Sequence, residues 1–259
     1  MELTLYQIDA FANKVFEGNP AAVCPLEKWL PDETLQSIAS ENNLSETAYL
    51  VQTDNGYHIR WFTPVREVKL CGHATLASAY VLFGLLGYAN DRIDFESLGG
   101  ILTVKRDGDW LEMDFPAQPP AVCEAPHAVI SAFQQTPVQC LRAEDYIVIF
   151  EDEASVALAD PNMEELRKLD LRGVAITSRA EHYDFVTRFF APKYGINEDP
   201  VTGSAFTQLI PYWAQALNKN SLKARQISQR GGEVLCGLSG KRVTISGKAV
   251  KYLEGKITI

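Results

Sequence analysis

The 259-residue sequence has no cluster of basic residues, and its formal net charge at pH 7 is −9. Proteins that bind nucleic acid usually carry a basic patch that contacts the phosphates. We therefore expect no nucleic-acid partner. An anionic ligand would need hydrogen-bond donors close to it, because salt screens charge interactions beyond about 8 Å.

Paired cysteines are also missing. The chain has five cysteines, an odd number, with no CxxC pair among them: Cys24, Cys71, Cys123, Cys140 and Cys236. Disulfide frameworks and structural zinc sites show cysteines in pairs or at fixed short spacings. We therefore expect reduced thiols, no bound metal and a cytoplasmic location.

Long hydrophobic runs are absent as well. No apolar stretch reaches the roughly 18 residues of a membrane helix without interruption, and the start of the chain, Met1 to Leu5, lacks the basic region of a signal peptide. The hydrophobic content of 46% and charged content of 22% are typical of globular proteins. We expect no membrane partner.

What the sequence does contain is an internal repeat. Three short segments recur in the same order: RWFTP at 60–64 and RFFAP at 188–192, GHA at 72–74 and GSA at 203–205, GG at 99–100 and at 231–232. The period is far longer than the roughly 20–50 residues of a solenoid repeat. It predicts two similar α/β (α+β) units with a cleft between them, and small-molecule sites form preferentially at such interfaces.

A proline-rich, aperiodic stretch at 117–127 is the best linker in the chain. It makes 1–116 the first repeat and 128–253 the second, while a final strand at about 254–259 has no counterpart before the linker and is expected to join the first repeat. Each copy has one helix that is apolar on nearly every side, at 73–86 and at 205–217. Such a helix must be buried, which predicts a curled, mostly antiparallel sheet around a central helix in each unit.

Both apolar helices begin just after a glycine, Gly72 before His73 and Gly203 before Ser204. The first N–H groups of a helix lack partners within it, and the helix dipole adds about half a positive charge there. Glycine lets a ligand approach the backbone closely. The two helix starts are therefore either a shared binding site for a carboxylate or simply two tight strand-to-helix turns.

The repeat fails at Glu46, where the second copy has no carboxylate. A glutamate that enters a strand beside a cleft can act as general acid and base, although glutamate in such a turn is also an ordinary solvated residue. His73 is either a catalyst or a structural histidine at the helix start. Asp199, which precedes Pro200, is either a ligand-binding residue or a common turn residue.

Six segments together resemble the phenazine-biosynthesis-like (PhzF-type) isomerase family: DAF at 9–11, GNPAAV at 18–23, NLSET at 43–47, GHAT at 72–75, EDPVTGSA at 198–205 and QRGG at 229–232. The resemblance implies the diaminopimelate-epimerase-like fold with the active site between two domains. It also implies a cofactor-free isomerase, usually a homodimer. By position, Glu46 matches the family's acid/base residue, and the residues that match its substrate site are Gly72, His73, Asp199, Gly203 and Ser204.

The sequence thus predicts an isomerase without cofactor or metal, in which Glu46 moves a proton on a small carboxylate-bearing substrate at the cleft between the domains. Related racemases use one thiol from each half, but here Cys71 has no cysteine opposite it in the second motif. Two alternatives remain: an epimerase that uses Cys71 with Glu46, and a duplicated ligand-binding protein without turnover. Phe206, which follows the second motif, affects the shape of the pocket, so the identity of the substrate stays open.

Overall fold

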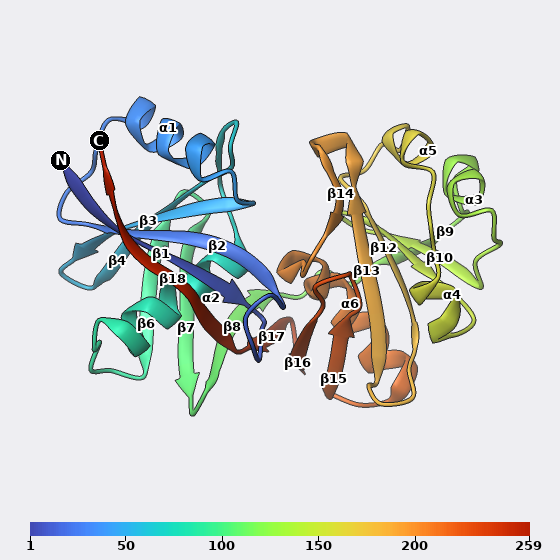
Figure 1. Cartoon of the computed structure of the whole chain (residues 1–259). Coiled ribbons are helices and arrows are strands. Elements are labelled where there is room, and N and C mark those ends of the chain that lie inside the picture. The colour runs from blue at the N-terminus through green and yellow to red at the C-terminus, as the bar shows by residue number, and fades with distance from the viewer. The chain divides into compact units, whose positions relative to one another are not determined.

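The computed structural model describes residues 1–259 and contains two compact units (Figure 1). The first unit comprises Met1–Asp114 with Ser246–Ile259, and the second comprises Phe115–Ile245. The stretch at 117–127, expected to be a linker, belongs to the second unit because part of it forms a paired strand, β9 (Ala121–Cys123). The segment that returns to the first unit starts at Ser246 and not near 254.

The first unit is built on one sheet. Its strands are β1 (Glu2–Ala10), β2 (Asn19–Leu26), β3 (Glu46–Thr53), β4 (Gly56–Phe62), β5 (Glu67–Val68), β6 (Arg92–Ser97), β7 (Gly100–Asp107), β8 (Trp110–Pro116) and β18 (Ala249–Thr258). The order across the sheet is β18-β1-β2-β3-β4-β6-β7-β8, with the short β5 also paired to β4. Only β2–β3 and β4–β6 are parallel. The C-terminal strand thus returns to pair with the N-terminal one.

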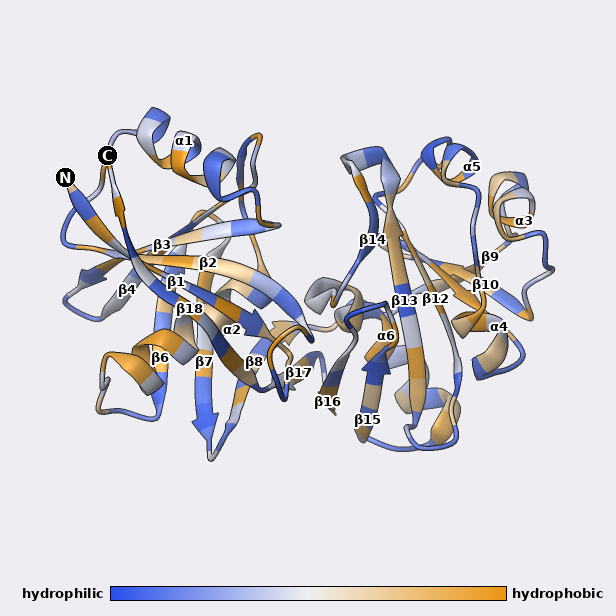
Figure 2. Ribbon diagram, in the orientation of Figure 1, coloured by the Kyte–Doolittle hydropathy of each residue, from blue (hydrophilic) through white to orange (hydrophobic).

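Two helices accompany this sheet. Helix α1 (Asp32–Asn42) connects the parallel strands β2 and β3, and buries Leu35, Ile38 and Ala39 while its other residues stay more exposed. Figure 2 shows the resulting alternation of hydrophilic and hydrophobic residues around it. Helix α2 (Gly72–Tyr80) continues as a π-helical turn, η1 (Val81–Leu85). It contacts β1, β2, β3 and β18 and is buried from His73 to Ala79, as expected for an apolar helix enclosed by a sheet.

The second unit repeats this topology. Its strands are β9, β10 (Gln139–Arg142), β11 (Tyr146–Ile149), β12 (Val174–Arg179), β13 (Phe185–Ala191), β14 (Ile196–Asp199), β15 (Ser221–Gln226), β16 (Gly232–Ser239) and most of β17 (Arg242–Gly247). The order β9-β10-β11-β12-β13-β15-β16 has parallel pairs at β11–β12 and β13–β15, the positions that correspond to those in the first unit. Strand β9 takes the place of β18, and β14 on β13 takes the place of β5.

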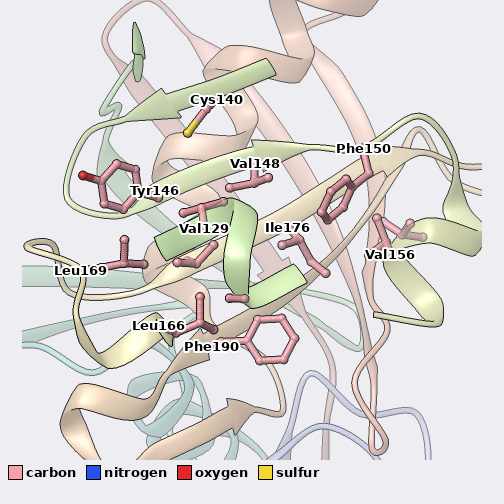
Figure 3. Close-up of a cluster of buried hydrophobic side chains, with 13 residues drawn as sticks. Val129, Cys140, Tyr146, Val148, Phe150, Val156, Leu166, Leu169, Ile176 and Phe190 are labelled. Atoms are coloured by element: carbon pink, nitrogen blue, oxygen red, sulfur yellow. The ribbon is translucent and has the colours of Figure 1, made fainter. Parts of the chain in front are cut away.

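Helix α6 (Gly203–Leu217) corresponds to α2, contacts β15 and β16, and is buried over most of its length. The other helices are α3 (His127–Phe133), α4 (Glu153–Ala157), α5 (Met163–Arg167) and the 3-10 turn η2 (Pro192–Tyr194). Apolar side chains from α3 and from β10 to β13 form a core cluster, shown in Figure 3. None of the helices has the length and apolar character needed to cross a membrane.

The repeated segments form the same structure twice. Arg60 Nε and Nη2 donate to the two carboxylate oxygens of Glu67, both at 2.7 Å. Arg188 makes the same bidentate contact with Glu198, through hydrogen bonds of 2.7 and 3.0 Å. In each unit the guanidinium also lies 5.1 Å from the ring of the phenylalanine two residues further along the strand. The sequence match between the two segments therefore reflects a shared strand-and-arginine arrangement.

Candidate active site

Glu46 is the first residue of β3 and lies where the chain leaves α1. The helix ends with Asn43 in the left-handed conformation (φ 47°), which turns the chain towards the sheet. Glu46 then pairs with Ala21 of the parallel strand β2. The hydroxyl of Ser45 donates to the side-chain oxygen of Asn19 at 3.3 Å. The position of the carboxylate is therefore set by a helix end, a strand register and a side-chain contact in the turn.

His73, in the first turn of α2, meets Glu46. Its Nε2 lies 3.1 Å from Glu46 Oε2, and the two side chains are 9% and 14% exposed. The distance is that of a hydrogen bond, but the direction is not, so both atoms are buried without a hydrogen-bond partner. Buried polar atoms in this condition are rare. The pair is therefore a close ionic contact in which neither atom is committed to a hydrogen bond.

Cys71 contacts the other side of the same imidazole. It precedes α2 directly, and its Sγ lies 3.6 Å from His73 Nδ1. Burial, together with the nearby charge of Glu46, raises the pKa of the Cys71 thiol to about 11. The sulfur is therefore a protonated thiol near neutral pH, and it fixes the orientation of the ring.

Burial by itself would lower the pKa of His73, but the sulfur of Cys71 and the carboxylate of Glu46 outweigh it, and the pKa lies well above 6.5. The charge contribution of Cys71 requires a thiolate, which a thiol pKa of about 11 excludes near pH 7. Near pH 7 the carboxylate of Glu46 is therefore the charged neighbour that raises the pKa of the imidazole. The first unit holds a buried carboxylate–imidazolium pair beside a neutral thiol.

The predicted residues of the second unit lie on the loop that enters α6. The hydroxyl of Thr202 donates to Asp199 Oδ2 at 2.5 Å. Gln226, at the end of β15 and fully buried, accepts a bond from the Thr202 N–H at 2.9 Å and donates to the Asp199 carbonyl at 2.7 Å. Gly203 is the first residue of the helix and is buried, whereas Ser204 is partly exposed. The segment from Asp199 to Ser204 is thereby held in one conformation.

The two helix starts share a further property. Neither Cys71 before α2 nor Thr202 before α6 caps its helix with a side-chain hydrogen bond. Gly72 and Gly203 stand at the first helical position in each case. Side-chain capping is the usual way to satisfy the first N–H groups of a helix. Both of the alternatives that the sequence left open, a carboxylate-binding position and a tight strand-to-helix turn, fit these helix starts.

The structure thus brings Glu46 and His73 into contact within the first unit. In the second unit Asp199 ends β14, and Gly203 and Ser204 begin α6. The contact between Cys71 and His73 was not expected, although the CGH order placed the two side chains near each other. Gln226 was missed altogether. Its only sequence signal is a glutamine at the end of a strand, three residues before the QRGG motif.

Glu46, Cys71 and His73 also offer three ligand atoms within 4.8 Å of one another. Mixed sulfur, nitrogen and oxygen ligands suit zinc. The imidazole, however, presents Nδ1 to the sulfur and Nε2 to the carboxylate. A metal ion on one nitrogen would lie away from the ligand at the other. The arrangement fits a proton-transfer pair better than a metal site.

Comparison with known proteins adds a family and a fold. The family model PhzC-PhzF, phenazine biosynthesis-like protein, matches residues 8–255. A Pseudomonas aeruginosa protein named as an uncharacterized isomerase is 51% identical over 257 residues, 99% of each chain. A solved structure of a PhzF-family protein from Enterococcus faecalis has a TM-score of 0.98 and 43% identity, with full coverage of both chains. A hydroxyproline epimerase from Agrobacterium vitis shares the fold, with a TM-score of 0.62 and 11% identity over 99% of this chain and 92% of that one.

Proposed function

Because this protein belongs to the PhzC–PhzF family of phenazine biosynthesis-like proteins and is an isomerase, we propose that Glu46 moves a proton between carbon atoms of a small carboxylate-bearing substrate. The observation that carries the proposal is the buried contact of 3.1 Å between Glu46 Oε2 and His73 Nε2. Since neither atom makes a hydrogen bond, the carboxylate accepts a proton without first breaking a hydrogen bond.

The protonation states of the cluster favour Glu46 as the base. His73 already carries a proton near neutral pH, and the Cys71 thiol, with a pKa of about 11, keeps its own. The carboxylate is the group left to accept a proton from carbon. The imidazolium beside it steadies the negative charge before the transfer, which makes His73 a positioning and electrostatic partner in this proposal.

The reaction balances without an external reagent. Glu46 takes a proton from a carbon next to the substrate's carboxylate or a conjugated double bond, and the electrons of the C–H bond move into the adjoining π system. The neutral carboxylic acid of Glu46 then returns the proton to another carbon, or to the same carbon. Substrate and product have the same composition, so the step consumes no cofactor or reductant.

We further propose that backbone N–H groups around Gly72, at the start of α2, bind the substrate carboxylate. Gly203 and Ser204 are the corresponding positions at the start of α6, and we propose them as substrate-binding residues of the second unit. Helix N-termini stabilise anions by typically 0.3–1 kcal/mol and by up to about 2 kcal/mol when partly buried. Asp199 would orient a polar group of the substrate. This part of the proposal rests on the sequence repeat and on the matching, uncapped starts of the two helices.

A second candidate is an epimerase in which Cys71 delivers or removes a proton together with Glu46. The contact of its sulfur with His73 Nδ1 favours some role for the thiol. A thiolate is the reactive form of cysteine, and burial raises the pKa of Cys71 to about 11. The thiol therefore suits holding the ring better than abstracting a proton.

Isotope uptake from solvent tests the proposal without knowledge of the product. The protein is incubated in deuterium oxide with a panel of cyclic and α-substituted carboxylic acids, and each acid is examined by mass spectrometry. An isomerase that moves a proton through Glu46 is expected to add one mass unit to at least one acid. The same acid with the Glu46→Gln variant is expected to gain none on the same timescale. A panel member that binds but never exchanges would favour the ligand-binding alternative.

A further inference from the structure

Two of the five thiols lie together, away from the cluster of Glu46, Cys71 and His73. Cys123 on β9 and Cys140 on β10 are directly opposite each other in an antiparallel strand pair. Side chains at such positions project from the same face of a sheet. Their sulfur atoms are 3.7 Å apart, and the Cys123 thiol is directed at Cys140. No other pair of cysteines in the chain is in contact.

The two thiols differ in access. Cys140 is 3% exposed and belongs to the core cluster of the second unit, where Figure 3 shows its side chain on β10. Cys123 is the only one of the five cysteines that is not buried, and it packs against that cluster from the edge strand. A small oxidant in solvent therefore reaches Cys123 first and finds a second thiol directly behind it.

The site also lies on a strand that pairs over fewer positions than its counterpart in the first unit. In the first unit β18 pairs with β1 over nine residue positions, whereas β9 pairs with β10 over three. A short edge strand has few backbone hydrogen bonds to hold it, so a small displacement breaks few of them. Opposite Cβ atoms in a sheet are about 4.5–5.5 Å apart, and a disulfide needs about 3.5–4.5 Å. A shift of about 1 Å in β9 is enough for closure.

We propose that Cys123 and Cys140 form a peroxide-sensitive dithiol, a modification site that closes to a cross-strand disulfide and fastens β9 to the second unit. In the first step the sulfur of Cys123 attacks one oxygen of hydrogen peroxide. An S–O bond forms, the O–O bond breaks and water leaves. In the second step the sulfur of Cys140 attacks the sulfenic sulfur, the S–O bond breaks and a second water leaves. The two thiols lose two protons and two electrons, which the peroxide accepts.

The second step is expected to be slow and to depend on pH. Burial and the neighbouring Cys123 raise the pKa of Cys140 to about 12, and the thiolate is the attacking form. Closure should therefore accelerate as the pH rises from 7 to 9, approaching tenfold per pH unit. The sulfenic acid on Cys123 should accumulate long enough to be trapped with dimedone.

Mass spectrometry of the full chain tests the proposal. Treatment with hydrogen peroxide is expected to lower the mass by 2 Da, and dithiothreitol is expected to restore it. Both cysteines lie in one tryptic segment, 107–142, and cleavage after Glu124 separates them. Double digestion should therefore yield two peptides joined through sulfur. Peroxide should also raise the Tm of the second unit by on the order of 5 °C, because a disulfide between Cys123 and Cys140 closes a loop and so restricts the unfolded chain.

Matched variants separate this site from the other thiols. Cys123→Ser, a change at a partly exposed edge position, is expected to fold and to lose the 2 Da change and the Tm shift. Cys236→Ser is expected to keep both. Progressive gain of 16 or 32 Da on Cys123 without a joined peptide would overturn the proposal, as would an unchanged mass or a disulfide that involves other cysteines.

Discussion

His73 contacts a sulfur with one ring nitrogen and a carboxylate with the other. The protonation state of His73 therefore depends on both of these neighbours. A group whose pKa is higher in the folded protein stabilises the fold fully below its unfolded pKa, and this stabilisation is lost as the pH rises through the folded pKa.

The unfolded value for His73 is near 6.5, and the folded value is well above it. The stability difference between the wild type and a His73→Asn variant is therefore expected to be constant below about pH 6.5 and to shrink as the pH is raised further. Chemical denaturation at several pH values measures it. Proton NMR should also show His73 titrating well above 6.5. A His73 that titrates near or below 6.5 would contradict the ion pair.

Substitutions at Cys71 distinguish a positioning thiol from a reactive one. In Cys71→Ser a hydroxyl can still meet His73 Nδ1, so most of the exchange activity is expected to remain. Cys71→Ala removes the contact, and a misplaced ring can cost up to about 10²-fold in rate. Deuterium-exchange rates of both variants, with Tm as a check on folding, measure the effect. Equal and complete loss in both variants would favour the cysteine-assisted epimerase.

At the scale of single residues, separate sequence motifs identified Glu46 and His73, but the sequence did not predict the contact between them. They come from a strand start and a helix start 27 positions apart, and only the register of β3 and the placement of α2 decide how their side chains meet. Gln226 was missed for a similar reason: its two bonds to the loop of Asp199 and Thr202 are visible only after β15 is placed beside that loop.

Among the elements, α6 depends on a buried charge in the turn between β10 and β11. Asp145 is fully buried and accepts hydrogen bonds from Arg172 at 2.5 and 2.9 Å. Gln208 of α6 donates to the same carboxylate at 2.7 Å and accepts from the Asp145 N–H at 3.0 Å. The helix is therefore anchored near its middle to a buried carboxylate, whose arginine partner is 30% exposed.

Removing the arginine of that pair should lower the free energy of unfolding substantially. Arg172→Met leaves a buried carboxylate without its counter-charge, and breaking a buried pair in this way destabilises by about 3–5 kcal/mol. The matched control is Arg142→Met, which breaks an ion pair with Asp170 whose side chains are 47% and 64% exposed, and which should cost no more than about 1 kcal/mol. Urea unfolding compares the two. Similar losses in both variants would show that Asp145 does not depend on its partner.

Element positions followed well from sequence periodicity where the apolar pattern was strong. Both central helices were predicted, and α6 differs from its predicted range only at its first residues. The predicted helix at 73–86 proved to be α2 followed by a π-helical turn. A π turn retains an apolar surface and leaves no distinct pattern in the sequence. The short strand β9 was hidden by the prolines around it, since Pro119, Pro120 and Pro126 flank a segment with only three paired residues.

At the scale of the whole molecule, the internal repeat predicted two units of equal topology, and the strand orders confirm it. The unit boundaries were harder to predict, because the proline-rich segment that reads as a linker contributes a strand to the second unit. The long pairing of β18 with β1 sets the return point at Ser246. Strand pairing over such a sequence separation has no local signal in composition or periodicity.

This pairing predicts that β18 is required for the first unit. A chain that ends before Ala249 would leave the backbone groups of β1 unpaired along one edge and expose apolar side chains that β18 covers. We expect loss of cooperative unfolding of the first unit, and aggregation, while the second unit still unfolds cooperatively. Differential scanning calorimetry measures both transitions. A truncated chain with an unchanged unfolding profile would contradict the role of β18.

The most direct test of the account is the rate of deuterium exchange catalysed by Glu46→Gln. The amide keeps the size of the side chain and removes the base, and positioned acid/base groups contribute typically 10²–10⁴-fold. Glu41→Gln, an exposed position on α1, is the matched control and should retain the wild-type rate. We predict a loss of 10²-fold or more for Glu46→Gln with little change in Tm. A Glu46→Gln variant that exchanges its substrate at more than about a third of the wild-type rate would contradict proton transfer by Glu46.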